Sequence, residues 1–124
     1  MQVFKNKAFS KWALKEGLGD EVLLAAIDEI NQGLVDADLG GQVFKKRVAV
    51  GGRGKSGGFR TLLAYRAADK AFFVYGFAKN ARANISNKEL KALKMYANTL
   101  LSYSRVELNK AVKGGALIEV VNDG

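Results

Sequence analysis

The spacing of apolar residues changes twice along the chain, and these changes limit the folds that the chain can adopt. Up to about residue 34, apolar residues recur every three to four positions, which is the spacing of an amphipathic helix. From Phe44 to Lys79 they mostly alternate with other residues, as in strands of a sheet. Beyond Ser86 the helical spacing returns. This order predicts an α+β fold, in which a helical hairpin is followed by a twisted antiparallel sheet and then by C-terminal helices.

The N-terminal region is expected to contain a short strand and two helices. Residues 3–5 can form the strand, and a brief amphipathic helix then runs to Gly17. The apolar side of this helix consists of Phe9, Trp12 and Ala13. A second helix is expected from Asp20, whose carboxylate can cap it, to Gly33, a residue type that commonly ends helices. The apolar side of the second helix consists of Leu23, Ile27, Ile30 and Leu34.

Three segments rich in β-forming residues come next. In the first, one side carries Phe44, Val48 and Val50, and the other carries Lys45, Arg47 and Ala49. Lys46 is a charged exception on the apolar side. Segments 59–67 and 71–79 flank a turn at residues 68–70, so we expect them to pair as a hairpin.

Two capping boxes mark the starts of the C-terminal helices. Ser86 is followed three residues later by Glu89, and Ser104 is followed at the same spacing by Glu107. The buried side of the first helix is expected to consist of Leu90, Leu93, Ala97, Leu100 and Leu101, and that of the second of Leu108, Ala111 and Val112. Residues 116–121 can add a final edge strand. Because no linker divides the chain, we expect one domain over residues 1–124.

The composition excludes several kinds of chemistry. The chain has no cysteine and no histidine, so it cannot contain a disulfide, a Cys/His zinc site or a Cys or His nucleophile or base. We therefore expect no metal and no other cofactor. The sequence has neither a signal-peptide pattern nor the run of about 18 apolar residues that a membrane span needs, so we expect a cytoplasmic protein without a membrane partner.

The positive charge is concentrated in the middle of the chain. Residues 39–88 contain eleven lysines and arginines but only one acidic residue, Asp69, whereas the flanking segments are together slightly acidic. Positive charge concentrated in one part of a small protein is typical of a surface that binds a polyanion. The alternative is that these cations are exposed to solvent and bind no ligand, which is the more common case for a charged segment considered by itself.

A glycine-rich segment at residues 51–58 resembles known phosphate-binding motifs without matching them. Gly52, Gly54 and Gly57 have the dinucleotide-binding spacing, but a strand rather than a helix follows them. A P-loop is excluded because Ala49 stands where its first glycine should be. The remaining interpretation is a loop between strands whose backbone N–H groups, together with Arg53, Lys55 and Ser56, can approach a phosphate.

Strand alternation predicts that several of the cations share one face of the sheet. If Phe44 and Val48 face the helices, Lys45 and Arg47 lie on the opposite face. One concave surface could then collect cations from three strands and a loop: Lys45, Arg47, Arg60, Lys79 and Arg82. Five aromatic residues of the hairpin, at positions 59, 72, 73, 75 and 77, are expected mainly in the core, with Tyr75 and Phe77 as the best candidates for stacking on bases.

Three segments carry a resemblance to a known family. They are GLVDADLGG at residues 33–41, KKRVAVGGRGKSGGFR at residues 45–60 and FFVYGFAKNARANIS at residues 72–86. Over residues 3–101, the sequence resembles the RelE/HigB branch of type II toxin–antitoxin toxins. The resemblance implies a microbial-ribonuclease-like fold, with helices on one face of a twisted antiparallel sheet and an open face that cuts messenger RNA, usually on the ribosome.

The resemblance also implies site residues and partners. By motif, the catalytic cations are Lys45, Arg47, Arg60 and Lys79. Further contacts to RNA are assigned to Lys46, Arg53, Lys55, Ser56, Arg66 and Arg82. Relatives often use a late tyrosine or histidine as well, a role that neither Tyr96 nor Tyr103 clearly matches. The implied partners are messenger RNA, the ribosome and a cognate antitoxin, which we expect to be a small helix-turn-helix protein.

These residues suggest a reaction in which the RNA supplies its own nucleophile. We hypothesise that the 2′-hydroxyl attacks the adjacent phosphate and that Arg60 and Arg47 stabilise the added charge. The proton acceptor would be Lys45 or Lys79, because repulsion from neighbouring cations favours the neutral amine. Two alternatives remain at this point: a ParE-like toxin that poisons gyrase, and a nucleic-acid-binding module without catalytic activity.

Overall fold

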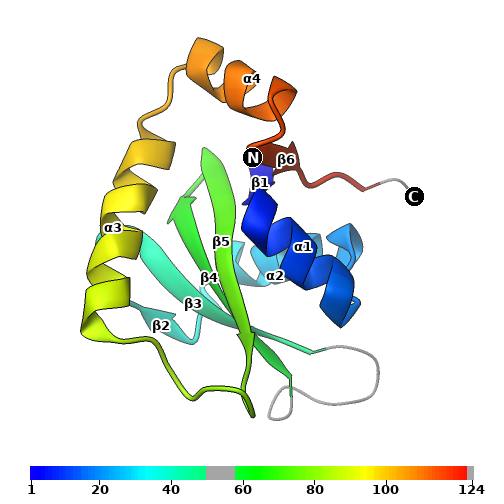
Figure 1. The fold of residues 1–124 in the computed structure, drawn as a ribbon, viewed down its shortest axis with the longest axis vertical. Helices are drawn as coiled ribbons and strands as arrows, with labels where there is room; N and C mark the ends of the chain where they lie inside the picture. The colour runs from blue at the N-terminus through cyan, green and yellow to red at the C-terminus, as the bar shows by residue number, and fades with distance from the viewer. Residues whose placement is uncertain (50–57, 123–124) are drawn as a thin grey trace.

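A computed structural model describes residues 1–49 and 58–122 of the chain. The elements follow one another in the order strand, two helices, four strands, two helices and a last strand (Figure 1). They are β1 (Gln2–Asn6), α1 (Lys7–Glu16), α2 (Asp20–Asn31), β2 (Ala37–Asp38), β3 (Val43–Val48), β4 (Phe59–Arg66), β5 (Lys70–Ala78), α3 (Asn87–Leu101), α4 (Arg105–Lys113) and β6 (Leu117–Glu119). The predicted α+β class, with a helical hairpin before the main strands and helices after them, is confirmed.

The strands form one sheet in the order β2-β3-β4-β5-β1-β6. The strands β2 to β5 pair antiparallel in sequence order. β1 then inserts between β5 and β6, parallel to β5 and antiparallel to β6. The final edge strand is therefore confirmed, and it joins the N-terminal strand rather than the hairpin. The two-residue strand β2 has no counterpart in the sequence analysis.

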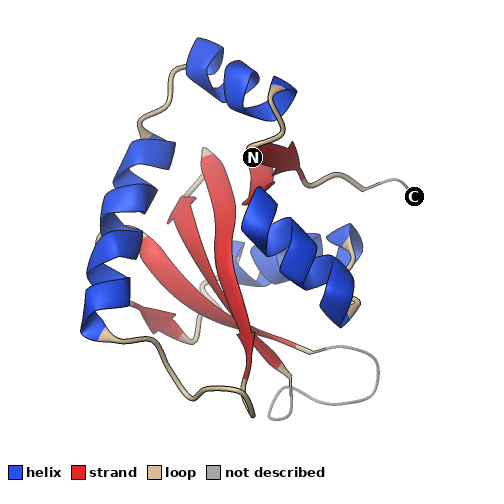
Figure 2. Ribbon diagram, viewed as in Figure 1, coloured by secondary structure: helices blue, strands red, loops and turns tan. Residues whose placement is uncertain are grey.

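Helices cover both faces of the sheet (Figure 2). On one face, α1 and α2 pack against a buried cluster that includes Phe9, Ile27 and Phe73. On the other face, α3 and α4 cover a second cluster that includes Phe72 and Leu100. The implied arrangement with helices on one face only is wrong, because the apolar side of α3 buries Val43 and its strand neighbours at one end of the second face. The opposite end of that face carries the cations.

The contact between α1 and the sheet requires a residue without a side chain. A Cβ atom at Gly76 of β5 would collide with the indole ring of Trp12 on α1. The Trp12 ring also contacts Phe59 edge-on, with ring centroids 5.5 Å apart. A bulge in the β4–β5 pairing at Leu62 and Leu63 lies close by. These contacts fix β4 and β5 against α1, and thereby fix which side chains of these strands face away from it.

The helix ends show which signals in the sequence were reliable. Both capping boxes form as predicted, with Ser86 and Ser104 each accepting a backbone hydrogen bond. The predicted cap by Asp20 is wrong: Gly19 is the N-cap of α2, and the Asp20 carboxylate instead accepts hydrogen bonds from Lys5 and from the backbone of Val121. Leu34 lies beyond the end of α2 and is half exposed, and Val112 is also partly exposed, so neither belongs to a buried stripe.

Candidate active site

The pairing of β3, β4 and β5 brings three of the predicted cations onto one face. Arg47 is directly opposite Arg60, which is opposite Phe77. In the next row along the strands, Lys45 is opposite Leu62, which is opposite Tyr75. Directly paired residues point to the same side of a sheet, and so do residues two apart in a strand. Lys45, Arg47 and Arg60 therefore share the face that lies opposite α1 and α2, as alternation predicted.

These three cations line a cleft of about 300 Å³. The other lining residues are Asp36, which precedes β2, and Ala83, in the loop between β5 and α3. Three cations and one carboxylate leave the cleft with an excess of positive charge. A cleft of this composition can accept an anion.

Arg60 has one guanidinium nitrogen that is buried without a hydrogen-bond partner among the described residues. The residue is only 8% exposed. Its Nη1 atom is inaccessible to solvent and unpaired within the part of the chain that the structure describes. Burying an unpaired polar or charged group costs free energy, and native proteins seldom leave such groups without a role. Because Arg60 also lines the cleft, an anion bound there would offset part of the cost of burying its charge.

Asp36 is a site residue that the sequence analysis missed. Its carboxylate accepts hydrogen bonds from the backbone N–H of Arg47 and, at 2.7 Å, from the Arg47 Nε. Burial alone would raise the pKa of Asp36, but the hydrogen bonds from Arg47 and the charges of Arg47 and Lys46 lower it below its ordinary value. Asp36 is therefore ionised near neutral pH and holds the Arg47 guanidinium in place. Its position depends on the two-residue strand β2, which is too short to leave a periodic pattern in the sequence.

Lys46 lies on the other face of the sheet, so the structure does not place it among the cations of the cleft, where its contact with RNA was expected. It is 4% exposed. Its ammonium donates to the carbonyl oxygen of Leu34 at 2.8 Å and lies 2.6 Å from the carboxylate of Glu29 on α2. The pleat of β3 directs this side chain toward α2 while its neighbours in the strand face the cleft. The charged residue that interrupted the apolar pattern is thus a buried lysine, paired with the partly exposed carboxylate of Glu29.

The match to a known family covers nearly the whole chain. A family model described as the RelE toxin of the RelE/RelB toxin–antitoxin system matches residues 1–120. The chain belongs to the RelE toxin family. A search of curated proteins found no match. RelE toxins act in toxin–antitoxin pairs and are generally endoribonucleases that inhibit translation, so this RelE toxin has a cognate antitoxin as its partner.

Arg82 of the RelE toxin connects the β5–α3 loop to α3. Its guanidinium donates to both carboxylate oxygens of Glu89, at 2.6 and 3.0 Å, and to the Tyr75 hydroxyl at 3.1 Å. It also lies over the rings of Tyr75 and Phe77. Glu89 raises the pKa of Arg82, and Arg82 in turn lowers the pKa of Glu89 to about 2. In this structure, Arg82 shapes the loop beside the cleft and does not line the cleft.

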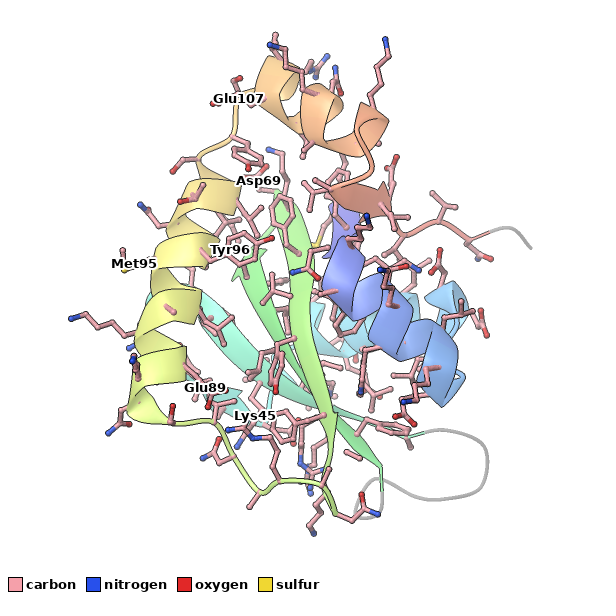
Figure 3. The ribbon with its side chains drawn as sticks, viewed as in Figure 1. Lys45, Asp69, Glu89, Met95, Tyr96 and Glu107 are labelled. Carbon is pink, nitrogen blue, oxygen red and sulfur yellow. The ribbon has the colours of Figure 1, made fainter. Side chains whose placement is uncertain are left out.

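The remaining predicted site residues are spread over the RelE toxin. Lys79 follows β5 and is exposed; its backbone N–H donates to Gly58, but its side chain is not part of the cleft lining. Arg66 lies at the far end of β4, where it pairs with Asp69, a residue that Figure 3 shows at the opposite end of the sheet from Lys45. Arg53, Lys55 and Ser56 lie outside the described residues.

Two further features of the described residues bear on function. No group of three or more Asp, Glu, His or Cys residues is arranged to hold a metal ion within residues 1–49 and 58–122. In the same part of the chain, no helix has both the length and the apolar character that a bilayer span requires.

Proposed function

We propose that this RelE toxin is an endoribonuclease that cuts messenger RNA in the cleft between β3, β4 and the β5–α3 loop. The observation that carries the proposal is the cleft lined by Lys45, Arg47 and Arg60, where the buried Nη1 of Arg60 has no hydrogen-bond partner among the described residues. A phosphodiester of the RNA backbone is an anion that this cleft can accept. Arginine suits the task because its planar guanidinium stays protonated and can bind two phosphate oxygens at once.

The proposed reaction uses the RNA 2′-hydroxyl as the nucleophile. Its oxygen forms a bond to the adjacent phosphorus, and the bond from phosphorus to the 5′-oxygen of the next nucleotide breaks. The products are a 2′,3′-cyclic phosphate and a 5′-hydroxyl. Arg60 and Arg47 stabilise the charge on the pentavalent phosphate, with Arg47 held by Asp36. One lysine takes the 2′-hydroxyl proton and another protonates the leaving oxygen; we assign these roles to Lys45 and Lys79.

The ribosome and the antitoxin complete the proposal. The exposed position of Lys79 fits a reaction in which the ribosome orients the RNA and completes the site. The antitoxin, a small helix-turn-helix protein, covers the basic face and blocks the cleft. We further propose that the RNA backbone contacts Arg53, Lys55 and Ser56. The toxin is also proposed to act in the cytoplasm.

The variant Arg60→Ala tests the proposed function. Loss of one preorganised charge-stabilising group reduces rates by on the order of 10²-fold or more, so cleavage should nearly cease. The measurement is primer extension on messenger RNA in a translating extract, with purified toxin. Arg105→Ala, at the exposed start of α4, is the matched control and should cut at the parental rate. Far-UV circular dichroism and thermal unfolding show whether both variants fold.

The same assay separates the alternatives. Cleavage by Arg60→Ala at the parental rate would show that the proposed role of this residue is wrong. A parental toxin that produces no new transcript ends but blocks DNA supercoiling by gyrase would be a ParE-like poison. A parental toxin that binds RNA in a salt-sensitive manner but leaves it intact, with and without ribosomes, would be a binding module only.

A further inference from the structure

A polar pocket lies where the starts of β1 and β5 meet α4, and its volume is about 420 Å³. This volume is within the usual range of small-molecule sites. Lys70 begins β5, and Phe77, which is opposite Arg60, lies seven positions further along the same strand. At about 3.3 Å per residue, this separation is roughly 23 Å. Figure 3 likewise shows Asp69, the neighbour of Lys70, at the other end of the sheet from Lys45. The pocket and the cationic cleft are therefore different sites.

The lining of the pocket is polar and carries two positive charges. It consists of Gln2, Lys70, Arg105, Leu108 and Asn109. The two nearest carboxylates in the sequence are not part of this lining. Asp69 is shared between Lys70 and Arg66, and Glu107 accepts a backbone hydrogen bond within the capping box of α4. Two cations without a lining carboxylate among the described residues leave an excess of positive charge, which favours an anionic ligand.

The lining side chains have hydrogen-bonding groups to spare. Gln2, Arg105 and Asn109 are exposed, and their side chains form no hydrogen bond or ion pair with another residue in the described part of the chain. The Lys70 ammonium donates to Asp69 at 3.1 Å, but an ammonium has three donors, so others remain. The guanidinium of Arg105 can bind two oxygens of one phosphate, and Lys70 can add a second charge to the same group.

We propose that this pocket binds a sugar phosphate, with the phosphate at Lys70 and Arg105 and the sugar hydroxyls at Gln2 and Asn109. Phosphate oxygens accept hydrogen bonds, and the two cations can only donate them. A side-chain amide both donates and accepts, as a sugar hydroxyl does. A sugar phosphate therefore matches both parts of the lining, whereas free phosphate matches only the cations. This inference is independent of the proposed function, because it does not involve the cleft.

The test compares ligands with and without the phosphate on variants with and without each pocket cation. The ligands are ribose 5-phosphate, ribose and inorganic phosphate, and isothermal titration calorimetry gives their dissociation constants. Arg105→Ala and Lys70→Met each remove one cation of the pocket. Lys110→Ala removes a cation of the same helix that does not line the pocket, and Arg60→Ala alters the cleft instead. Thermal unfolding shows whether each variant is folded.

Ribose 5-phosphate should bind to the parental toxin, to Lys110→Ala and to Arg60→Ala with the same affinity. Arg105→Ala and Lys70→Met should each bind it about tenfold more weakly, because each loses a charge-assisted hydrogen bond to the phosphate. Ribose and inorganic phosphate should also bind to the parental toxin about tenfold or more weaker than the ester, since each engages only part of the lining.

Several results would overturn the proposal. The parental toxin could fail to bind ribose 5-phosphate, or Arg105→Ala and Lys70→Met could both bind it with unchanged affinity. Inorganic phosphate that binds as tightly as the ester would make the pocket a site for free phosphate. Loss of binding in Arg60→Ala would place the ester in the cleft. Displacement of the ester from Arg60→Ala by a short 2′-O-methyl oligonucleotide would make the pocket part of the RNA-binding surface.

Discussion

Lys45 and Lys46 show how far the environment, and not the residue type, decides what a side chain does. They are adjacent in β3, but the pleat sends Lys45 into the cleft and Lys46 under α2. Alternation in the sequence was enough to separate them, since Lys46 interrupted the apolar side. The partners of Lys46 could not be predicted in this way, because the Leu34 carbonyl and Glu29 come from a helix end whose position depends on the tertiary fold.

Replacing each lysine by methionine should therefore give opposite results. Lys46→Met removes a buried, hydrogen-bonded ammonium, so we expect the free energy of unfolding to fall by about 1–3 kcal/mol while the cleavage rate per folded molecule is retained. Lys45→Met should lower the cleavage rate by on the order of 10²-fold or more and leave the free energy of unfolding unchanged or higher. Urea unfolding and initial cleavage rates measure the two effects. Loss of cleavage in a fully folded Lys46→Met variant would mean that Lys46 reaches the RNA after all.

Helix α3 has one feature that the sequence predicts, its capping box, and one that the sequence does not predict, the ion pair between Glu89 and Arg82. The capping box at its start was predicted from Ser86 and Glu89 alone, and it forms. The second role of Glu89, as the partner of Arg82, depends on how the β5–α3 loop folds back over Tyr75 and Phe77. The second capping box, at Glu107 of α4, has the same local hydrogen bonds without an arginine.

This difference between the two capping boxes predicts a pH dependence of stability. The Arg82 and Ser86 hydrogen bonds lower the pKa of Glu89 from an ordinary 4.5 to about 2, so its ionised form stabilises the folded protein above pH 4.5. That contribution is lost as the pH falls from 4.5 toward about 2. The parental toxin should thus have a higher urea midpoint than Glu89→Gln at neutral pH, and the two should converge over this range. Glu107→Gln should show a smaller difference, and a Glu89→Gln difference that does not change with pH would contradict the prediction.

The sheet shows where local patterns stop being informative. Alternation identified the segments of β3, β4 and β5, and the cap residues fixed the starts of α3 and α4. The parallel insertion of β1 between β5 and β6 left no local trace, because strand order is set by packing between residues far apart in the chain. The role of Asp36 could not be predicted for the same reason, because this residue reaches the cleft only when β2 pairs with β3.

At the scale of the whole molecule, the concentrated charge of residues 39–88 is only partly available to a ligand. Several cations of this segment form ion pairs in the described structure: Lys46, Arg47, Arg66, Lys70 and Arg82. Of the cleft cations, Arg47 is held by Asp36, whereas Arg60 has no hydrogen-bond partner for its buried Nη1 among the described residues. The net charge therefore overstates the number of cations that can contact a phosphate, and the site depends on where they lie.

The salt dependence of RNA binding distinguishes a localised site from a diffuse field. For single strands, log affinity falls against log salt concentration with a slope of roughly −0.7 for each phosphate that the protein neutralises. Arg60→Ala should reduce the magnitude of this slope by about 0.7. Arg66→Ala, which removes a cation of the same segment that is paired with Asp69 at the far end of the sheet, should leave it unchanged. Fluorescence anisotropy titrations of a short fluorescein-labelled 2′-O-methyl oligonucleotide, which lacks the attacking hydroxyl, give the slopes over a series of salt concentrations. Equal changes in the two variants would mean that the RNA responds to the total charge of the toxin and that no phosphate occupies the Arg60 cleft.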